Sequence, residues 1–212
     1  PPCMSVWADH EAANDAWRPG AENHERETEG DFATRKAAAL RAYYEWMPIR
    51  EPRAGAMHEA INRAFHFGDL ASLVMVETRL LARDPQMAFT DLGRTAEGAP
   101  DVAGFEARRN DPSRDLLGDA QRQWIGETLS QSKAAGRPWQ ILGNQVVMAR
   151  VKGPNVEQMV PAEQLEQLLA SLPADTRPQV EAAIQLFKLG LPFNLDSWDG
   201  YPAGRERLYE TF

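Results

Sequence analysis

The order in which strand-like and helix-like segments follow one another is the feature that most constrains the fold of this chain. Short apolar runs rich in β-branched and aromatic residues predict strands, whereas apolar residues at helical spacing predict helices. In chain order they predict a strand over residues 3–7, a helix over 32–47, a two-stranded hairpin over 63–79, a helix over 118–135, a strand over 139–149, and helices over 161–171 and 175–189. Strands and helices mixed in this way predict an α/β protein.

Two stretches of the chain predict loops. Residues 15–30 carry Pro19, two glycines and many charges, and residues 84–115 carry three prolines and few apolar anchors. Asp31 and Pro48 are placed to begin and end the helix between them. A long loop in a compact domain is often functional, so residues 84–115 are a candidate functional segment.

Length and charge narrow the classes of function. A chain of 212 residues can form one large domain or two small ones. Its 31 acidic and 23 basic residues give a formal net charge of −8. This balance argues against nucleic acid as the main partner, because duplex binding relies on clustered Lys and Arg. No apolar run approaches the roughly 18 residues that a membrane span needs, so no span is predicted.

The most informative polar segment is ADHEAAND, residues 8–15, directly after the first predicted strand. Ligands gather at the carboxyl ends of strands in open α/β sheets. Asp9 and Asn14 offer oxygens and His10 an imidazole, which suit Ca²⁺, Mn²⁺, Zn²⁺ or iron. Metal ions can stabilise both oxygens of an in-line displacement, which makes phosphoester hydrolysis the natural chemistry. Spacing alone favours the alternative, in which Asp9 or Asn14 caps a helix and His10 is a surface residue.

Six segments in a fixed order resemble one family. They read VWADHEAANDAW, GDFATRKAAALRAYYEWMPIR, FHFGDLASLVMVETR, LLGDAQRQWIGETLSQS, WQILGNQVVM and NLDSWDGYPAGRERL. Over nearly its whole length the chain is similar to the alkaline phosphatase D (PhoD-like) family of metallophosphoesterases. The resemblance implies a calcineurin-like sandwich of two mixed β-sheets flanked by helices. Residues 1–212 would be the central portion of a single domain, incomplete at both ends.

The resemblance also implies an activity and a set of metals. Members hydrolyse phosphomonoesters and phosphodiesters at a site that holds Ca²⁺ and Fe³⁺. By resemblance, Asp9 and Asn14 are the expected metal ligands, His10 contacts the phosphate or the leaving group, and Glu11 binds substrate or supports a residue that does. Ala8 departs from the family, which usually has Asp at this position. If that missing carboxylate were a ligand, activity would be affected.

Arg79 is the second expected catalytic residue, because its guanidinium could hold a phosphate through two bonds. Glu77 stands where the family usually has Asp before Thr-Arg, so a carboxylate is kept with one extra methylene. An ion pair of Arg79 with Glu77 or Asp69, supporting the end of the strand, is an equally good interpretation.

The segment DSWDGYP, residues 196–202, is the other part that resembles the family closely. Asp196 and Tyr201 are expected to bind substrate or to support residues that do. Trp198 and Arg205 are expected to have structural roles, with Arg205 anchoring the loop. Asp199-Gly200 is itself a turn signal, so the whole segment could equally be a structural turn.

The family draws further metal ligands from an N-terminal Asp, a Gly-Asp segment and a later Gly-Asp-x-His segment. No counterpart of these is identified in this sequence. We therefore expect a chain that is inactive alone, with its remaining ligands encoded outside residues 1–212. The family resemblance also implies a periplasmic or extracellular location, and the sequence pattern indicates no particular oligomeric state.

Two other functions stay open. One is a non-catalytic module in which tryptophan-rich loops near residues 124, 139 and 198 bind a carbohydrate or a protein. Ligand binding by such a module would survive a chelator. The other is a phosphodiesterase that acts on lipid head groups, which only a panel of substrates would separate from a monoesterase.

Overall fold

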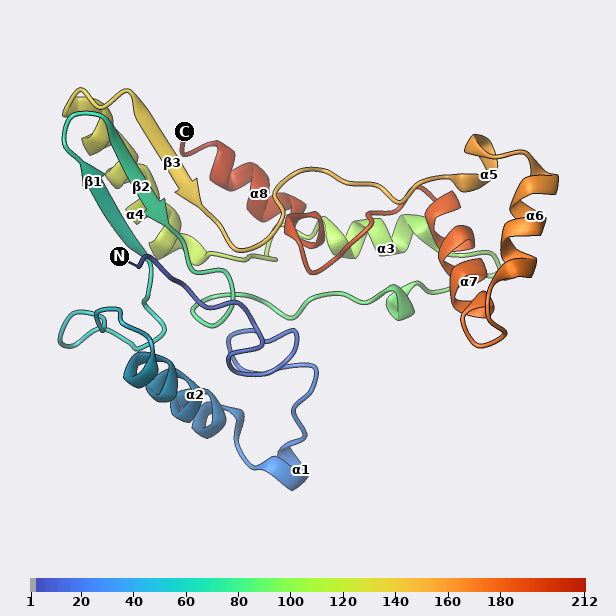
Figure 1. Ribbon diagram of the computed structural model, residues 1–212, viewed down its shortest axis with the longest axis horizontal. Helices are drawn as coiled ribbons and strands as arrows, with labels where there is room; N and C mark the ends of the chain where they lie inside the picture. Colours follow the sequence, from blue (N-terminus) through green and yellow to red (C-terminus); the bar gives the residue numbers. More distant parts are fainter. Residues whose placement is uncertain (1–2) are drawn as a thin grey trace.

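The computed structural model describes residues 3–212 and forms a mixed α/β fold, as predicted (Figure 1). The strands are β1 (Arg63–Phe67), β2 (Ala71–Met75) and β3 (Trp139–Gly143). The helices are α1 (Arg26–Glu29), α2 (Phe32–Trp46), α3 (Val102–Arg109), α4 (Gly118–Ala134), α5 (Val156–Met159), α6 (Ala162–Ser171), α7 (Arg177–Lys188) and α8 (Pro202–Tyr209), with 3-10 turns η1 (Phe89–Asp91) and η2 (Trp198–Gly200).

The three strands form one sheet in the order β1-β2-β3. β1 and β2 pair antiparallel through a tight turn, in which Gly68 adopts a φ of 54° that favours glycine. β2 and β3 pair parallel, with Ala71 opposite Trp139, and α4 lies in the connection between them. The predicted hairpin and the predicted helix over 118–135 are therefore confirmed.

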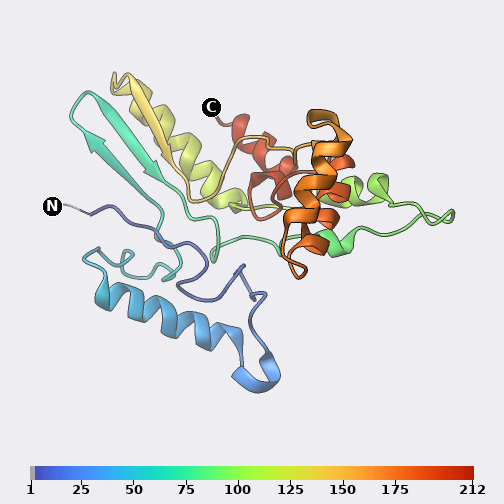
Figure 2. The ribbon, with the colours of Figure 1, turned by 45° about the vertical axis from the view of Figure 1, so that its right-hand side comes forward.

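The two faces of the sheet have different surroundings. α4 covers one face, where the Ser132 hydroxyl lies 2.7 Å from that of Ser72 and Val74 is fully buried. Figure 1 shows α4 behind the strands, and Figure 2 shows it running alongside them with α2 apart, below the sheet. The opposite face leaves apolar side chains in solvent: Phe67 is 46% exposed, Ile141 49% and Trp139 63%.

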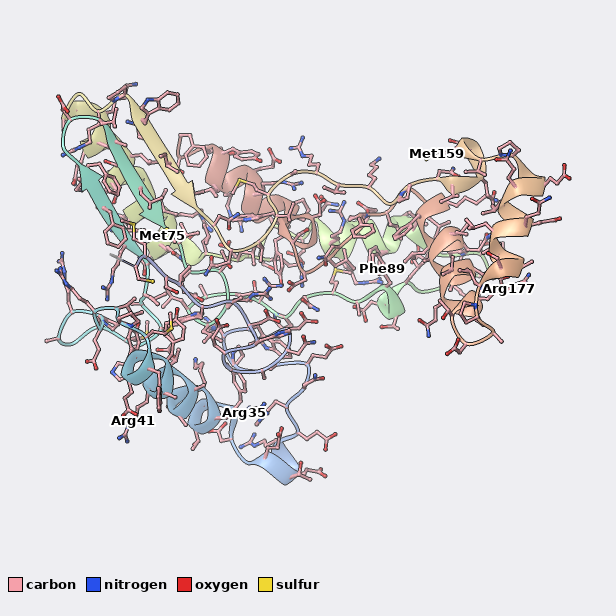
Figure 3. The ribbon with its side chains drawn as sticks, in the orientation of Figure 1. Arg35, Arg41, Met75, Phe89, Met159 and Arg177 are labelled. Atoms are coloured by element: carbon pink, nitrogen blue, oxygen red, sulfur yellow. The ribbon has the colours of Figure 1, made fainter. Side chains whose placement is uncertain are left out.

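The buried apolar residues gather in three clusters. The first joins the N-terminal segment to α2 and includes Trp7, Leu40 and Tyr44. The second lies between the sheet, α4 and α8, and the third lies around α3 and residues 191–195. Helices α5–α7 stand at the end of the molecule remote from the sheet, where Figure 3 labels Met159 and Arg177.

Helix α2 begins and ends where the sequence predicted. The Asp31 side chain accepts a hydrogen bond from the Ala33 N–H, and the helix ends at Trp46, before Pro48. The predicted helices over 161–171 and 175–189 are also confirmed as α6 and α7. These segments have strong local signals, namely caps, prolines and apolar spacing.

Three sequence predictions are wrong in detail. Residues 3–7 are not in a strand. Trp7 is fully buried, but side chains hold the segment: the Trp7 carbonyl accepts from the Gln145 amide at 3.1 Å. The strand over 139–149 ends at Gly143, directly before Asn144, where the sequence predicted an interruption, and it does not resume after it. The predicted loop over 84–115 contains α3, which Asp101 caps and Phe105 anchors in the core.

None of the helices in residues 3–212 has both the length and the apolar character that crossing a lipid bilayer requires.

Tyr44 gives the fold a measurable dependence on alkaline pH. The ring is 8% exposed and its hydroxyl donates to the His58 carbonyl at 3.0 Å, and burial raises the pKa of Tyr44 to about 12. Between the ordinary pKa near 10 and the raised pKa, the folded state binds more protons than the unfolded state. The free energy of unfolding should therefore fall as pH rises through this window.

We expect Tyr44→Phe to make that fall shallower, because phenylalanine cannot ionise. Urea unfolding at pH 9 and near pH 11.5 measures the change. The exposed Tyr209→Phe variant is the control and should keep the wild-type slope. An identical slope in Tyr44→Phe would show that Tyr44 is not the residue responsible.

Candidate functional site

The segment 8–15 forms a compact polar turn after the buried Trp7. The Asp9 carbonyl accepts hydrogen bonds from the N–H groups of Ala12 and Ala13, both at 2.9 Å. The Asp9 side chain closes the turn by accepting from the Asp15 N–H at 2.8 Å. Asp15 has a φ of 50°, an uncommon conformation for a residue other than glycine. The hydrogen bond from the Asp15 N–H thus fixes the Asp9 carboxylate within the turn.

His10 and Asn14 lie together on the outer side of this turn. The His10 Nε2 atom is 2.8 Å from the Asn14 side-chain oxygen, and the Asn14 amide donates to Glu22 at 2.6 Å. The His10 side chain is 77% exposed, so it is open to solvent. Glu11 is also exposed and accepts from the Ala8 N–H at 2.9 Å, which closes the start of the turn.

Arg79 binds a residue that neither sequence interpretation named as its partner. Its two terminal nitrogens each lie 2.6 Å from one oxygen of Asp196, a bidentate pair between residues 117 positions apart. The Arg79 side chain is 4% exposed, and its Nη2 atom lies 3.6 Å from the Asp9 carboxylate. The structure therefore brings together three predicted site residues, Asp9, Arg79 and Asp196. Arg79 therefore pairs with Asp196 and Asp9, and the alternative of an ion pair with Glu77 or Asp69 is not observed.

Glu77 instead holds the backbone of the bend after β2. One of its oxygens accepts from the Trp7 indole N–H and from the N–H groups of Arg79 and Leu80, at 2.8–2.9 Å. The other accepts from the Leu81 N–H at 2.8 Å. Burial raises the pKa of Glu77, and these bonds oppose the rise. This carboxylate ties the N-terminal segment to the bend that carries Arg79.

The charges of the cluster shift one another's ionisation. Burial opposes ionisation of Asp9, but the Asp15 N–H and the Arg79 charge outweigh it and lower the pKa of Asp9. Burial and the nearby Asp196 charge raise the pKa of Asp15. The Asn14 hydrogen bond and the Asp9 charge raise the pKa of His10. Asp9 is thus stabilised as an anion beside a histidine whose pKa is raised.

Tyr201 and its neighbours are buried and take part in packing. The Tyr201 ring is fully buried and its hydroxyl donates to the Asp84 carbonyl at 2.7 Å. Trp198 is also fully buried, and its indole N–H donates to Asn144 at 3.2 Å. Arg205 pairs with Asp199 at 2.7 Å, which anchors the loop as expected. The substrate role of Tyr201 stays a prediction.

The residues present do not by themselves make a metal site. Within residues 3–212, no group of three or more His, Cys, Asp and Glu side chains is arranged to hold a metal ion. The Asn14 side-chain oxygen already faces His10, and the Asp9 carboxylate faces Arg79. Calcium needs six to eight oxygens, more than Asp9 and Asn14 supply.

The sequence assigned no site role to three residues of the cluster: Arg83, Asp15 and Gln86. Arg83 follows Arg79 by four positions and also binds Asp196, at 2.5 Å. The Gln86 amide donates to Asp15 at 2.6 Å. The four-residue spacing of Arg79 and Arg83 was the available signal in the sequence. Because residues 84–115 were predicted to be a loop, nothing placed Arg83 or Gln86 beside Asp9. Two cavities, of about 510 and 840 Å³, are lined by other residues.

The fold and this cluster define a mixed α/β protein with a buried network of carboxylates and arginines beside an exposed histidine. The sequence profile of the PhoD-like phosphatases matches residues 1–212. The chain belongs to the PhoD-like phosphatase family.

Individual relatives agree with this assignment. Alkaline phosphatase D of Bacillus subtilis (strain 168) is 29% identical over 210 residues, which cover 98% of this chain and 27% of the relative. A solved structure described as "Structure of PhoD" is 28% identical, with a TM-score of 0.60, over 97% of this chain and 30% of that one. The chain therefore spans less than a third of the length of these relatives.

Proposed function

We propose that this chain is the central part of a metal-dependent hydrolase of phosphoric esters. The observation that carries the proposal is the meeting of Asp9, Arg79 and Asp196 in one network, in a chain that matches the phosphatase profile over its full length. These residues come from three segments far apart in the sequence. Phosphomonoesters and phosphodiesters are the proposed substrates, and phosphodiesters of lipid head groups are one subclass.

The proposed roles follow from exposure and charge. Asp9, kept anionic, and Asn14 are the proposed metal oxygens, with the ions Ca²⁺ and Fe³⁺ proposed from the family resemblance. Metal ions would stabilise charge on the phosphate. His10, which is exposed and has a raised pKa, is the residue proposed to contact the phosphate or the leaving group. Arg79 is buried, so we assign it to holding Asp9 and not to direct contact with phosphate.

We propose that the remaining ligands lie in parts of the protein that the relatives have and residues 1–212 do not cover. The test is hydrolysis of p-nitrophenyl phosphate and bis(p-nitrophenyl) phosphate with added calcium and iron. We expect activity in a reading frame extended in both directions, loss of activity with a chelator, and none in residues 1–212 alone. Activity in the short chain would contradict this.

Asp9→Ala in the extended protein should lower turnover by about 10²-fold or more, the usual loss for a misplaced catalytic constellation. Asp69→Ala is the matched control: it removes an exposed aspartate of the β1–β2 turn. Undiminished turnover in Asp9→Ala would remove Asp9 from the site.

We also propose that a second sheet covers the apolar face of β1, β2 and β3, which would complete the two-sheet sandwich. The exposure of Phe67, Ile141 and Trp139 on that face supports this. Trp139→Glu should then destabilise the extended protein by about 2 kcal/mol, the usual gain from burying a large apolar side chain. It should leave residues 1–212 nearly unaffected. Urea unfolding measures the effect of Trp139→Glu on the stability of the extended protein and of residues 1–212. Equal losses of stability in the two would argue against a covering sheet.

The alternative of a carbohydrate- or protein-binding module receives less support. It needs accessible tryptophans, but Trp198 is fully buried and Trp124 packs against the core, so only Trp139 of the three is exposed. We further propose, from the family resemblance, a periplasmic or extracellular location. Fractionation of cells that express the extended protein tests it, and activity confined to the cytoplasm would contradict it.

A further inference from the structure

Two arginines of one bend converge on a single carboxylate. Arg79 and Arg83 both follow β2, and both donate to Asp196, at 2.6 and 2.5 Å. Arg83 also donates to the Asp196 carbonyl at 3.1 Å. The side chain of Arg83 is 0% exposed, so it is fully buried. Asp196 is thus bonded to both arginines at once.

A second chain of contacts leads from Arg83 back to the predicted metal ligand. The Arg83 Nη2 atom donates to the Gln86 side-chain oxygen at 3.2 Å, and the Gln86 amide donates to the Asp15 carboxylate at 2.6 Å. The Asp15 N–H in turn donates to the Asp9 carboxylate at 2.8 Å. The contacts therefore form a closed ring, since Asp9 also lies 3.6 Å from Arg79. Its members, in order, are Arg83, Asp196, Arg79, Asp9, Asp15 and Gln86.

We propose that Arg83 is a positioning residue: through both arms of this ring it sets the orientation of Arg79 and of Asp9. The inference rests on the proposed function for its catalytic consequence, but not for its structural one. Arg83 contacts neither Asp9 nor any surface open to substrate, so it acts only through its neighbours.

The chemistry of the side chain supports this role. One nitrogen of Arg83, Nη2, donates to the Asp196 carboxylate, the Asp196 carbonyl and the Gln86 side-chain oxygen. Its Nε and Nη1 atoms are buried and have no hydrogen-bond partner within residues 3–212. Buried unpaired donors are costly. The unpaired Nε and Nη1 atoms therefore lower the stability of the protein, whereas Nη2 makes all the contacts of Arg83 with the ring of residues. A lysine ammonium ends one bond short of the Nη2 position, so it could not make the same set of contacts.

Arg114 provides a matched control. Its guanidinium lies over the Tyr201 ring at 4.9 Å from the centroid, the same distance as that of Arg83. Arg114 donates to the Pro85 carbonyl and has no bond to the ring of contacts. Arg83→Met and Arg114→Met therefore both remove a guanidinium from the face of the Tyr201 ring, and only the first removes the positioning contacts.

The first measurement is side-chain NMR of the arginines, with Arg79 assigned from an Arg79→Lys spectrum. A guanidinium held by two bonds shows separate signals for its terminal N–H groups, because its rotation is hindered. We expect Arg83→Met to lose the separate Arg79 signals and Arg114→Met to keep them. If Arg83→Met does not fold, Arg83→Lys answers the same question, because it keeps the buried charge but its ammonium ends one bond short of the Nη2 position that contacts Asp196 and Gln86.

The second measurement is steady-state kinetics in the extended, active protein. Arg83→Met should lower kcat by about 10²-fold, the effect of a small displacement of a catalytic group, with little change in KM. Arg83→Lys should recover part of the loss, and Arg114→Met should match the wild type.

Two results would overturn the inference: Arg79 signals that persist in the Arg83 variants, or equal losses in the Arg83 and Arg114 variants. Unchanged kcat despite lost Arg79 signals would also overturn it. If no phosphoester is hydrolysed by any form, the proposed function fails, and the Arg79 signals still decide the positioning claim.

Discussion

Replacing Asp196 by alanine should destabilise the protein by about 3–5 kcal/mol, the usual cost of breaking a buried ion pair by removing one partner. The substitution leaves two guanidinium groups, Arg79 and Arg83, buried without the carboxylate that binds both. Burial lowers the pKa of Arg83, yet an arginine does not lose its proton near neutral pH. The charges therefore stay, and their desolvation is no longer compensated. Urea unfolding at pH 8 measures the loss.

Asp196→Asn should lose less, because the amide oxygen can still accept one of the bonds. The exposed pair of Arg41 and Glu45 is the control, since its side chains are 77% and 54% exposed. Glu45→Ala should show no measurable change, as expected for surface ion pairs. An Asp196→Ala variant as stable as the wild type would mean that the arginines find other partners, with Asp9 and Asp15 the nearest candidates.

Glu77→Leu is expected to be at least as damaging, at about 4 kcal/mol or more. It removes the acceptor of four N–H groups that are bonded to one buried carboxylate, and hydrogen bonds to charged groups are worth about 1.5–3 kcal/mol each. The affected donors are those of Trp7, Arg79, Leu80 and Leu81. The bend after β2 and the N-terminal segment should loosen together.

Glu77→Gln separates the effect of losing the negative charge from the effect of losing the hydrogen bonds. A glutamine can keep its oxygen toward the three donors of Trp7, Arg79 and Leu80, and it then places its amide against the Leu81 N–H. We expect a loss of about 1.5–3 kcal/mol, the value of the one bond to a charged group that is lost. Urea unfolding and Trp7 fluorescence measure both variants. If Glu77→Gln were as unstable as Glu77→Leu, the negative charge would matter more than the number of bonds.

Most of the fold elements could be predicted because their signals are local. Asp31 and Pro48 mark the ends of α2, and Gly68 marks the turn of the β1–β2 hairpin. The strand predicted over residues 3–7 failed for the opposite reason. An apolar run indicates burial, but whether its backbone pairs with a strand depends on a neighbour that the run does not encode. In this chain Trp7 is buried through contacts with Glu77 and Gln145.

The candidate site also contains one part that the sequence predicts and one part that it does not. Asp9, His10 and Asn14 stand within six positions, so the sequence itself places them in one turn. The resemblance to phosphatases pointed to Arg79 and Asp196 separately. It did not pair them, and no spacing rule joins residues 117 positions apart.

The sequence by itself therefore determined the family, the α/β class and the polar segment at residues 8–15, because each depends on residue types and short spacings. Only the tertiary structure decided that Asp196 binds Arg79, and that Arg83 and Gln86 link this pair to Asp9. The reason is physical: a buried charge must be paired wherever the packed chain brings an opposite charge, and packing, not sequence distance, chooses that partner.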